Sequence, residues 1–145
     1  MTKYFSKLDA NNIVVDCLNV SDSDAPDEAT GQTYLRNLTN DSSSIWKETS
    51  RENSGNGFRG NMGGIGCTYM TGVRTLGVAS TDIFISQQPY ASWAIGVNTA
   101  QWLPPTNPGD APTLTSAEMT AGKRYVWNET NYNADPSTAW VLTSP

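Results

Sequence analysis

Two stretches in the second half of the chain follow the same plan, and this repetition limits the folds open to the sequence. The first, YASWAIGVNTAQWLPP (90–105), places two tryptophans on either side of a turn and ends in a double proline. The second, RYVWNETNYNADPSTAW (124–140), places two tryptophans on either side of a polar loop. Aromatic residues favour strands, and cross-strand aromatic pairs stabilise short hairpins. We therefore predict two aromatic hairpins, near 90–104 and 124–143.

The four tryptophans of these hairpins differ in their sequence surroundings. Trp93 and Trp127 alternate with other apolar residues, and residues two apart on a strand share one face. We predict that these two rings are core, and that Trp102 and Trp140 are contact residues. A flat ring on a β-surface can dock on a protein or stack on a sugar. The candidate docking or glycan-stacking surface comprises Tyr90, Trp102, Pro104, Pro105 and Trp140.

The first half of the chain predicts a sheet and a helix. KYFSKLDANNIVVDCLNVS reads as a hairpin with strands near 3–8 and 12–20, the second of which we expect to be covered on both faces. Asp24 is a candidate N-cap, Pro26 suits a first turn, and the apolar residues at 34, 35 and 38 recur at helical spacing. We predict a helix near 25–38 against the sheet. Further strands are predicted in SSSIWKETS and near 81–87. Between them we predict a long glycine-rich turn, RENSGNGFRGNMGGIG, that leads into GCTYM, and a loop in front of the strand at 81–87. A short helical turn is predicted near 116–119.

The length and composition favour one β-rich domain. The chain has 145 residues, of which 37% are hydrophobic and 16% charged, and asparagine, threonine, serine and glycine make up the difference. The predicted fold class is mainly β with a minor α part: a compact antiparallel sheet domain with one packed helix and two C-terminal aromatic hairpins. We expect a single domain, with residues 1–78 forming its first part and 79–145 its second.

The composition also argues against several classes of function. The net charge of -5 and the lack of a basic cluster argue against nucleic-acid binding, and no apolar run is long enough to cross a membrane. The start of the chain does not resemble a signal peptide, so we expect synthesis in a cytoplasm. With no histidine and no Cys-x-x-Cys spacing, Cys17 and Cys67 do not predict a zinc site. We expect them to be buried free thiols, with pairing left open, and we expect no metal and no cofactor.

Catalysis is not the function that the sequence favours. Without histidine the common nucleophile-histidine sites are excluded, which leaves a pair of carboxylates as in glycosidases. Most acidic residues stand at turns or strand edges, where a solvated carboxylate is the ordinary finding. We expect a protein that is not an enzyme. The candidate acids for the alternative are Asp9, Asp16, Glu48, Asp82, Glu118 and Glu129.

Four stretches of the chain resemble a family of small proteins of marine cyanophages and related tailed marine phages. They are YFSKLDANNIVVDCLNVSD, FRGNMGGIGCTYM, DIFISQQPYASW and YVWNETNYNADPSTAWV. The positions that match the motifs of this family are Phe5, Lys7, Leu8, Asp9, Asn11, Asn12, Ile13 and Val14; Arg59, Asn61, Gly64, Ile65, Gly66, Thr68 and Tyr69; Phe84, Ile85, Pro89, Tyr90, Ser92 and Trp93; and Trp127, Asn128 and Glu129.

This resemblance implies a virion component made in the host cytoplasm, and not an enzyme. The expected function is that of a capsid decoration or cement protein, which docks in many copies on the head exterior against the major capsid protein. Attachment to tail or fibre proteins is the close alternative, and a carbohydrate-binding adhesin for host-surface glycans is the next. A homo-oligomer is compatible with each. The acidic, polar composition suits solubility in such a role.

Overall fold

The protein is described by a computed structural model over residues 1–51, 57–74, 81–96 and 99–145. The chain divides into two compact units, which we describe separately. Unit 1 contains Met1–Gln87 and Gly96–Gln101, and unit 2 contains Gln88–Ile95 and Trp102–Pro145. That the chain is a single domain stays a prediction. Residues 52–56, 75–80 and 97–98 lie outside the described residues. They belong, in this order, to the predicted glycine-rich turn, to the segment before the predicted strand at 81–87 and to the turn of the first aromatic hairpin.

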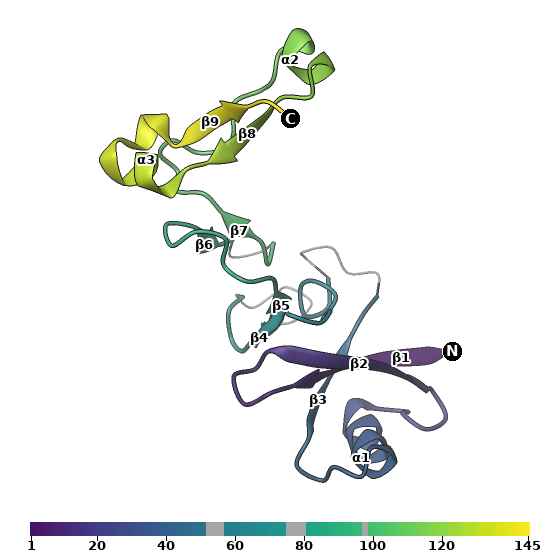
Figure 1. The fold of residues 1–145 in the computed structure, drawn as a ribbon. Coiled ribbons are helices and arrows are strands. Elements are labelled where there is room, and N and C mark those ends of the chain that lie inside the picture. The colour runs from purple at the N-terminus through teal and green to yellow at the C-terminus, as the bar shows by residue number, and fades with distance from the viewer. Residues whose placement is uncertain (52–56, 75–80, 97–98) are drawn as a thin grey trace. The chain divides into compact units, whose positions relative to one another are not determined.

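Unit 1 is built on an antiparallel sheet with strand order β2-β1-β3. A second antiparallel pair, β4-β5, and helix α1 lie on opposite sides of this sheet (Figure 1). The prediction of a β-rich fold with a minor α part is confirmed, as are the first hairpin and the strands in SSSIWKETS and near 81–87, whereas β4 was not predicted as a strand. The elements are β1 (Thr2–Leu8), β2 (Val14–Ser21), α1 (Glu28–Leu38), β3 (Ile45–Thr49), β4 (Thr68–Met70) and β5 (Ile83–Ile85).

Helix α1 begins later than its sequence predicts. Its N-cap is Asp27, whose carboxylate accepts the backbone N–H of Thr30 at 2.8 Å. Asp24, the predicted cap, instead accepts a hydrogen bond from the hydroxyl of Ser21 at 2.8 Å. The residue between them, Ala25, is fully buried and donates its N–H to Ser21 at 2.9 Å. Residues 25–27 therefore form the turn into the helix rather than its first turn.

The helix covers one face of the sheet over a compact apolar cluster. Phe5, Val20, Ala25, Leu35 and Trp46 form this cluster, and Phe5, Leu35 and Trp46 expose 0% of their surface. A side chain on the buried Gly31 would collide with the ring of Phe5. The glycine that weakens the helix on propensity alone thus lets the helix approach the sheet closely.

The opposite face of the sheet carries the second cluster, formed by Leu8, Val14, Tyr69 and Phe84. The sequence predicts that strand β2 is covered on both faces, and this prediction is wrong. Strand β2 is one of the two edge strands of the sheet, and several of its residues are exposed. Only Val14 and Val20 of β2 are buried, while Val15 is 46% exposed. Cys17 is exposed and Cys67 half-buried, so the prediction of free thiols holds and the prediction of their burial is wrong.

Unit 2 contains both aromatic hairpins. Strands β6 and β7 pair through Ile95 and Trp102, and β8 and β9 pair from Arg124 opposite Thr143 to Trp127 opposite Trp140. The predicted helical turn near 116–119 is confirmed, and the polar loop of the second hairpin contains two short helices that its sequence did not predict. The elements are β6 (Ala94–Ile95), β7 (Trp102–Leu103), α2 (Ser116–Thr120), β8 (Arg124–Trp127), α3 (Glu129–Ala134), the 3-10 helix η1 (Pro136–Thr138) and β9 (Trp140–Thr143).

Within the residues that the structure describes, none of the helices has the length and apolar character needed to cross a membrane.

Candidate functional site

Five rings of unit 2 form what we call the aromatic cluster: Tyr90, Trp93, Trp127, Tyr132 and Trp140. The ring centroids of Trp93 and Trp127 lie 5.7 Å apart with planes at 85°. Trp127 and Trp140 lie 5.2 Å apart with planes at 81°. Edge-to-face packing of this kind is favourable beyond the area that it buries. The central ring, Trp127, is only 4% exposed, so its prediction as core is confirmed.

A single carboxylate ties the two hairpins of the cluster together. Glu129 accepts the backbone N–H of Ser92 at 2.9 Å and the Ser92 hydroxyl at 2.7 Å. It also accepts the indole N–H of Trp127 at 2.7 Å. These hydrogen bonds, first from Ser92 and then from Trp127, lower the pKa of the Glu129 carboxyl. Two motifs that are far apart in the sequence, Tyr-Ala-Ser-Trp and Trp-Asn-Glu, are thus the two halves of one bonded arrangement.

The indole N–H groups of the two other rings are placed differently. Trp140 donates its indole N–H to the backbone carbonyl of Gly109 at 2.9 Å. This bond holds the proline-rich connector between the two hairpins, residues 104–123, against β9. The indole nitrogen of Trp93 is buried and has no hydrogen-bond partner within the described part of the chain. Trp93 packs edge-on against Trp127 and Trp140, and aromatic faces are weak acceptors for such a donor.

The aromatic cluster opens into a groove of about 360 Å³. Of the five residues predicted as a surface, Tyr90 and Trp140 line this groove, and Trp93, predicted as core, lines it as well. Trp102, Pro104 and Pro105 are half-buried and do not belong to its lining. The residues that line the groove are Tyr90, Trp93, Arg124, Tyr125, Val126, Trp127 and Trp140. We call this surface the aromatic groove.

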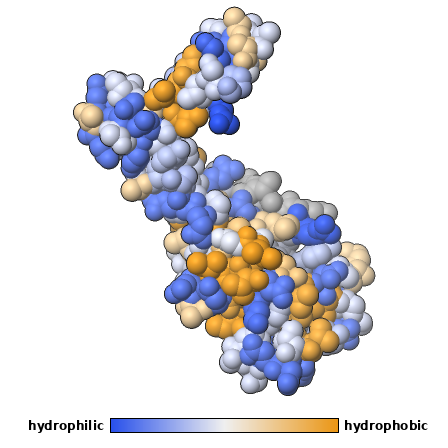
Figure 2. Space-filling model, viewed as in Figure 1, coloured by the Kyte–Doolittle hydropathy of each residue, from blue (hydrophilic) through white to orange (hydrophobic). Residues whose placement is uncertain are grey.

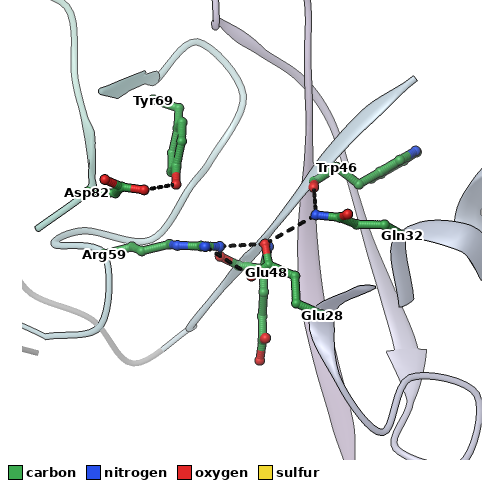
Figure 3. Close-up of polar contacts among 7 residues, drawn as sticks. All are labelled: Glu28, Gln32, Trp46, Glu48, Arg59, Tyr69 and Asp82. Atoms are coloured by element: carbon green, nitrogen blue, oxygen red, sulfur yellow. Dashed lines mark hydrogen bonds and ion pairs between the residues drawn. The ribbon is translucent and has the colours of Figure 1, made fainter. Parts of the chain in front are cut away.

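Unit 1 contains a polar network around Glu28 and Arg59 (Figure 3). Glu28 accepts two hydrogen bonds from the guanidinium of Arg59, at 2.7 and 2.9 Å, and the backbone N–H of Glu48 at 3.1 Å. Burial alone would raise the pKa of Glu28, but the hydrogen bonds from Arg59 and Glu48 outweigh it and lower that pKa. The network joins the start of α1 to β3 and to the segment that carries Arg59.

Tyr69 and Asp82 extend the same region. The phenol of Tyr69 donates to the carboxylate of Asp82, which also accepts the backbone N–H of Gly72 at 2.9 Å. Burial and the hydrogen bond to Asp82 raise the pKa of Tyr69. The guanidinium of Arg59 lies 5.6 Å from the centre of the Tyr69 ring, a cation-π distance.

The six candidate acids make different local contacts in the structure. Asp9 accepts hydrogen bonds from two backbone N–H groups of its own turn, and Asp16 accepts one from the backbone N–H of Cys17. Glu118 completes the capping box at the start of α2. Asp82 and Glu129 hold the groups described above. Glu48 differs, because burial and the nearby Glu28 raise its pKa. In the described parts of the chain, no three residues of the types histidine, cysteine, aspartate and glutamate are grouped to hold a metal ion.

Unit 1 also exposes apolar side chains where the glycine-rich segment lies over the sheet. Val15, Met62 and Ile65 are 46%, 43% and 72% exposed. Gly63 lets the segment approach closely, because a side chain there would collide with Ser6 and Phe84. Apolar side chains are visible at the surface of unit 1 in Figure 2.

No protein-family model matches the chain, and neither a curated protein nor a solved structure is similar to it. What the structure defines is a β-rich α+β protein with an aromatic groove in its second unit. The resemblance to proteins of marine phages stays a prediction.

Proposed function

We propose that the protein is a non-enzymatic structural protein of a tailed-phage virion, which docks through unit 2. The observation that carries the proposal is the aromatic groove, whose rings are partly exposed and yet held in place by one another and by Glu129. Rings that are already ordered lose little conformational entropy when a partner covers them. Aromatic residues are also the ones that contribute most to protein interfaces.

The arrangement of the carboxylates supports a binding role over a catalytic one. A glycosidase needs two acids on either side of a substrate. Among the described residues, no carboxylate lines the aromatic groove. Glu129, which accepts hydrogen bonds from Ser92 and from the groove residue Trp127, is engaged in holding the rings. The exposed apolar side chains of Val15, Met62 and Ile65 in unit 1 are further candidates for contact with a partner.

Within the virion we favour the head exterior, with the major capsid protein as the partner. A small protein that docks in many copies reinforces a shell by the sum of its contacts, each burying about 800 Å² per partner. Tail or fibre proteins are the alternative partners, and a homo-oligomer is compatible with either place.

The test is localisation of the protein on purified particles by cryo-electron microscopy. Density for the chain in many copies, following the symmetry of the shell, is the result expected for decoration. A small number of copies at the tail would move the proposal to the alternative location. Particles that lack the protein altogether would overturn it.

A second candidate, a carbohydrate-binding module, is favoured by the same rings. Sugars stack on exposed aromatic faces, and Trp140 and Tyr90 present such faces in the aromatic groove. Binding on a glycan array that is lost in Trp140→Ala but kept in Trp102→Ala would support this function, because Trp102 lies outside the groove. Absence of binding to any glycan of the array would set it aside.

A further inference from the structure

The aromatic groove follows the main chain of β8. Four consecutive residues, Arg124 to Trp127, line it. Neighbouring residues of a strand point to opposite faces, so side chains of one face alone cannot account for this lining. The groove therefore reaches the edge of the strand as well as the face that carries the rings.

The hydrogen-bond register shows which main-chain groups face that edge. Asn128 donates its N–H to Ala139 at 2.8 Å, directly after the pair Trp127 and Trp140. In an antiparallel pair, hydrogen-bonded and non-hydrogen-bonded positions alternate. Arg124 and Val126 therefore bond to β9, whereas the N–H and C=O groups of Tyr125 and Trp127 point away from it.

This outer edge of β8 is unpaired. Among the described strands β8 pairs only with β9, and the main-chain groups of Tyr125 and Trp127 make no hydrogen bond within the described residues. A two-stranded ribbon is marginally stable by itself, and a further strand would stabilise it. An unpaired edge beside pockets for alternate side chains is the arrangement by which proteins bind extended peptides.

The charge at one end of the edge indicates what such a peptide carries. Arg124 is exposed, lines the aromatic groove and forms no ion pair within the described residues. Lys123 stands beside it in the sequence. Both are cations, so an acidic residue in the peptide has a partner of opposite charge here.

We propose that β8 takes up an extended segment of a partner protein as a third strand. The segment pairs with the main-chain groups of Tyr125 and Trp127, places apolar side chains against the rings of the aromatic groove, and sets an acidic side chain opposite Arg124. This inference rests on the proposed docking role of unit 2 and specifies how the partner is held. Affinity comes from the main-chain bonds and specificity from the rings and the arginine.

The experiment titrates defined peptides into the ¹⁵N-labelled chain of 145 residues. The probes are two capped octapeptides in which serine and valine alternate and a glutamate stands at the carboxyl end or at the amino end, for antiparallel and parallel addition. The matched control peptide has the same side chains but carries methyl groups on its backbone nitrogens, so it cannot donate to a strand. The readouts are the amide signals of Tyr125 and Trp127 and their hydrogen-exchange rates.

We expect one of the two probes to shift these amides and slow their exchange. Methylation of the probe should weaken binding about tenfold or more, because about two main-chain hydrogen bonds are lost. Arg124→Glu should weaken it as well, whereas Arg51→Glu, the same change of charge on an exposed arginine of unit 1, should leave it unchanged.

Three results would overturn this inference. The methylated peptide could bind as tightly as the probe, which would leave the main chain of β8 without a role. The second such result is that neither probe shifts the amide signals of Tyr125 and Trp127 at millimolar concentration. Chitohexaose could instead shift the indole signals of Trp93 and Trp140, which would make the groove a sugar platform. The location of the protein on particles is measured separately, so failure of the peptide would not be confused with failure of the virion role.

Discussion

Units 1 and 2 use their aromatic residues in opposite ways. Unit 1 buries Phe5, Trp46 and Phe84 completely, in two clusters on either side of a sheet. In the described part of unit 2, Trp127 and Ala139 are the buried hydrophobic residues, and the other rings of the aromatic cluster are partly exposed. One unit is stabilised by burial of apolar area, and the other by ring-on-ring contacts and side-chain hydrogen bonds.

We infer from this difference that the aromatic residues of unit 1 serve stability and that those of unit 2 serve contact with a partner. Buried rings give stability but cannot contact a partner, while ordered and partly exposed rings can do so at little entropic cost. Unit 2 gives up part of the stability that full burial would provide and keeps its surface available. If this comparison is right, substitutions in unit 1 should change global stability, and substitutions in unit 2 should act mainly on local order and binding.

The largest effect is expected from Trp46→Ala. Its ring is fully buried under α1, and its indole N–H donates to Ser44 at 2.9 Å. Loss of a buried tryptophan side chain costs about 3–5 kcal/mol, which is a large part of the stability of a small domain. Urea unfolding followed by circular dichroism measures the change. Leu38→Ala, at a helix position that is 63% exposed, is the control and should change stability by less than about 0.5 kcal/mol.

A smaller loss is expected from Glu28→Gln. The variant removes the ion pair with Arg59, whose side chain is only 13% exposed, and should cost about 1–3 kcal/mol at neutral pH. Because the folded pKa of Glu28 is lowered, its contribution is complete above the unfolded value of about 4.3 and disappears as the pH falls through the folded value. The difference between wild type and variant in urea unfolding should therefore shrink in acid. An equal difference at all pH values would contradict the pairing, and Asp110→Asn, at an exposed position of the connector, is the control.

Trp140→Ala should have a still smaller effect on global stability. The ring is partly exposed, so its removal should cost about 1–2 kcal/mol, less than full burial would give. The loss should be confined to unit 2 and visible as faster hydrogen exchange in β8 and β9. Trp140→Phe keeps a ring in place and should restore most of the protection. Global unfolding with the cost expected for Trp46→Ala would show that the units do not differ as described.

The smallest effect is expected from Glu129→Gln, which acts on local order. The tie from Glu129 to Ser92 and Trp127 depends on a carboxylate whose folded pKa is lowered. The hydrogen bonds to the ionised carboxylate of Glu129 are therefore fully formed above the ordinary carboxyl pKa. They are lost as the pH falls through the lowered pKa of Glu129 in the folded protein. The indole signal of Trp127 should titrate in acid in the wild type and should not titrate in the variant. A signal that titrates in both would assign the change to another group.

The fold was accessible from the sequence where local signals agree with packing. The β-forming runs near 3–8 and 12–20 and the two tryptophan hairpins predicted strands that the structure contains. The start of α1 was misplaced because two aspartates, Asp24 and Asp27, both suit an N-cap, and only the packing of Ala25 decides between them. The exposure of β2 was missed because strand order, which places β2 at an edge, leaves no local signal.

The candidate site was accessible in part. Tyr90 and Trp140 were predicted as surface residues and do line the aromatic groove, whereas Trp102 does not. The role of Glu129 could not be read from its own stretch, because its partner Ser92 lies 37 residues earlier. The outer edge of β8 was missed as well. Which residues of β8 turn their main-chain groups away from β9 depends on the pairing register and not on residue type.

The measurement that tests the central claim most directly is hydrogen exchange of the protein bound to purified particles, compared with the free protein. The account predicts that docking slows exchange at β8, above all at Tyr125 and Trp127, and leaves the sheet of unit 1 unchanged. Protection confined to unit 1, around Met62 and Ile65 for example, with β8 exchanging as in the free protein, would contradict the claim that unit 2 is the docking module.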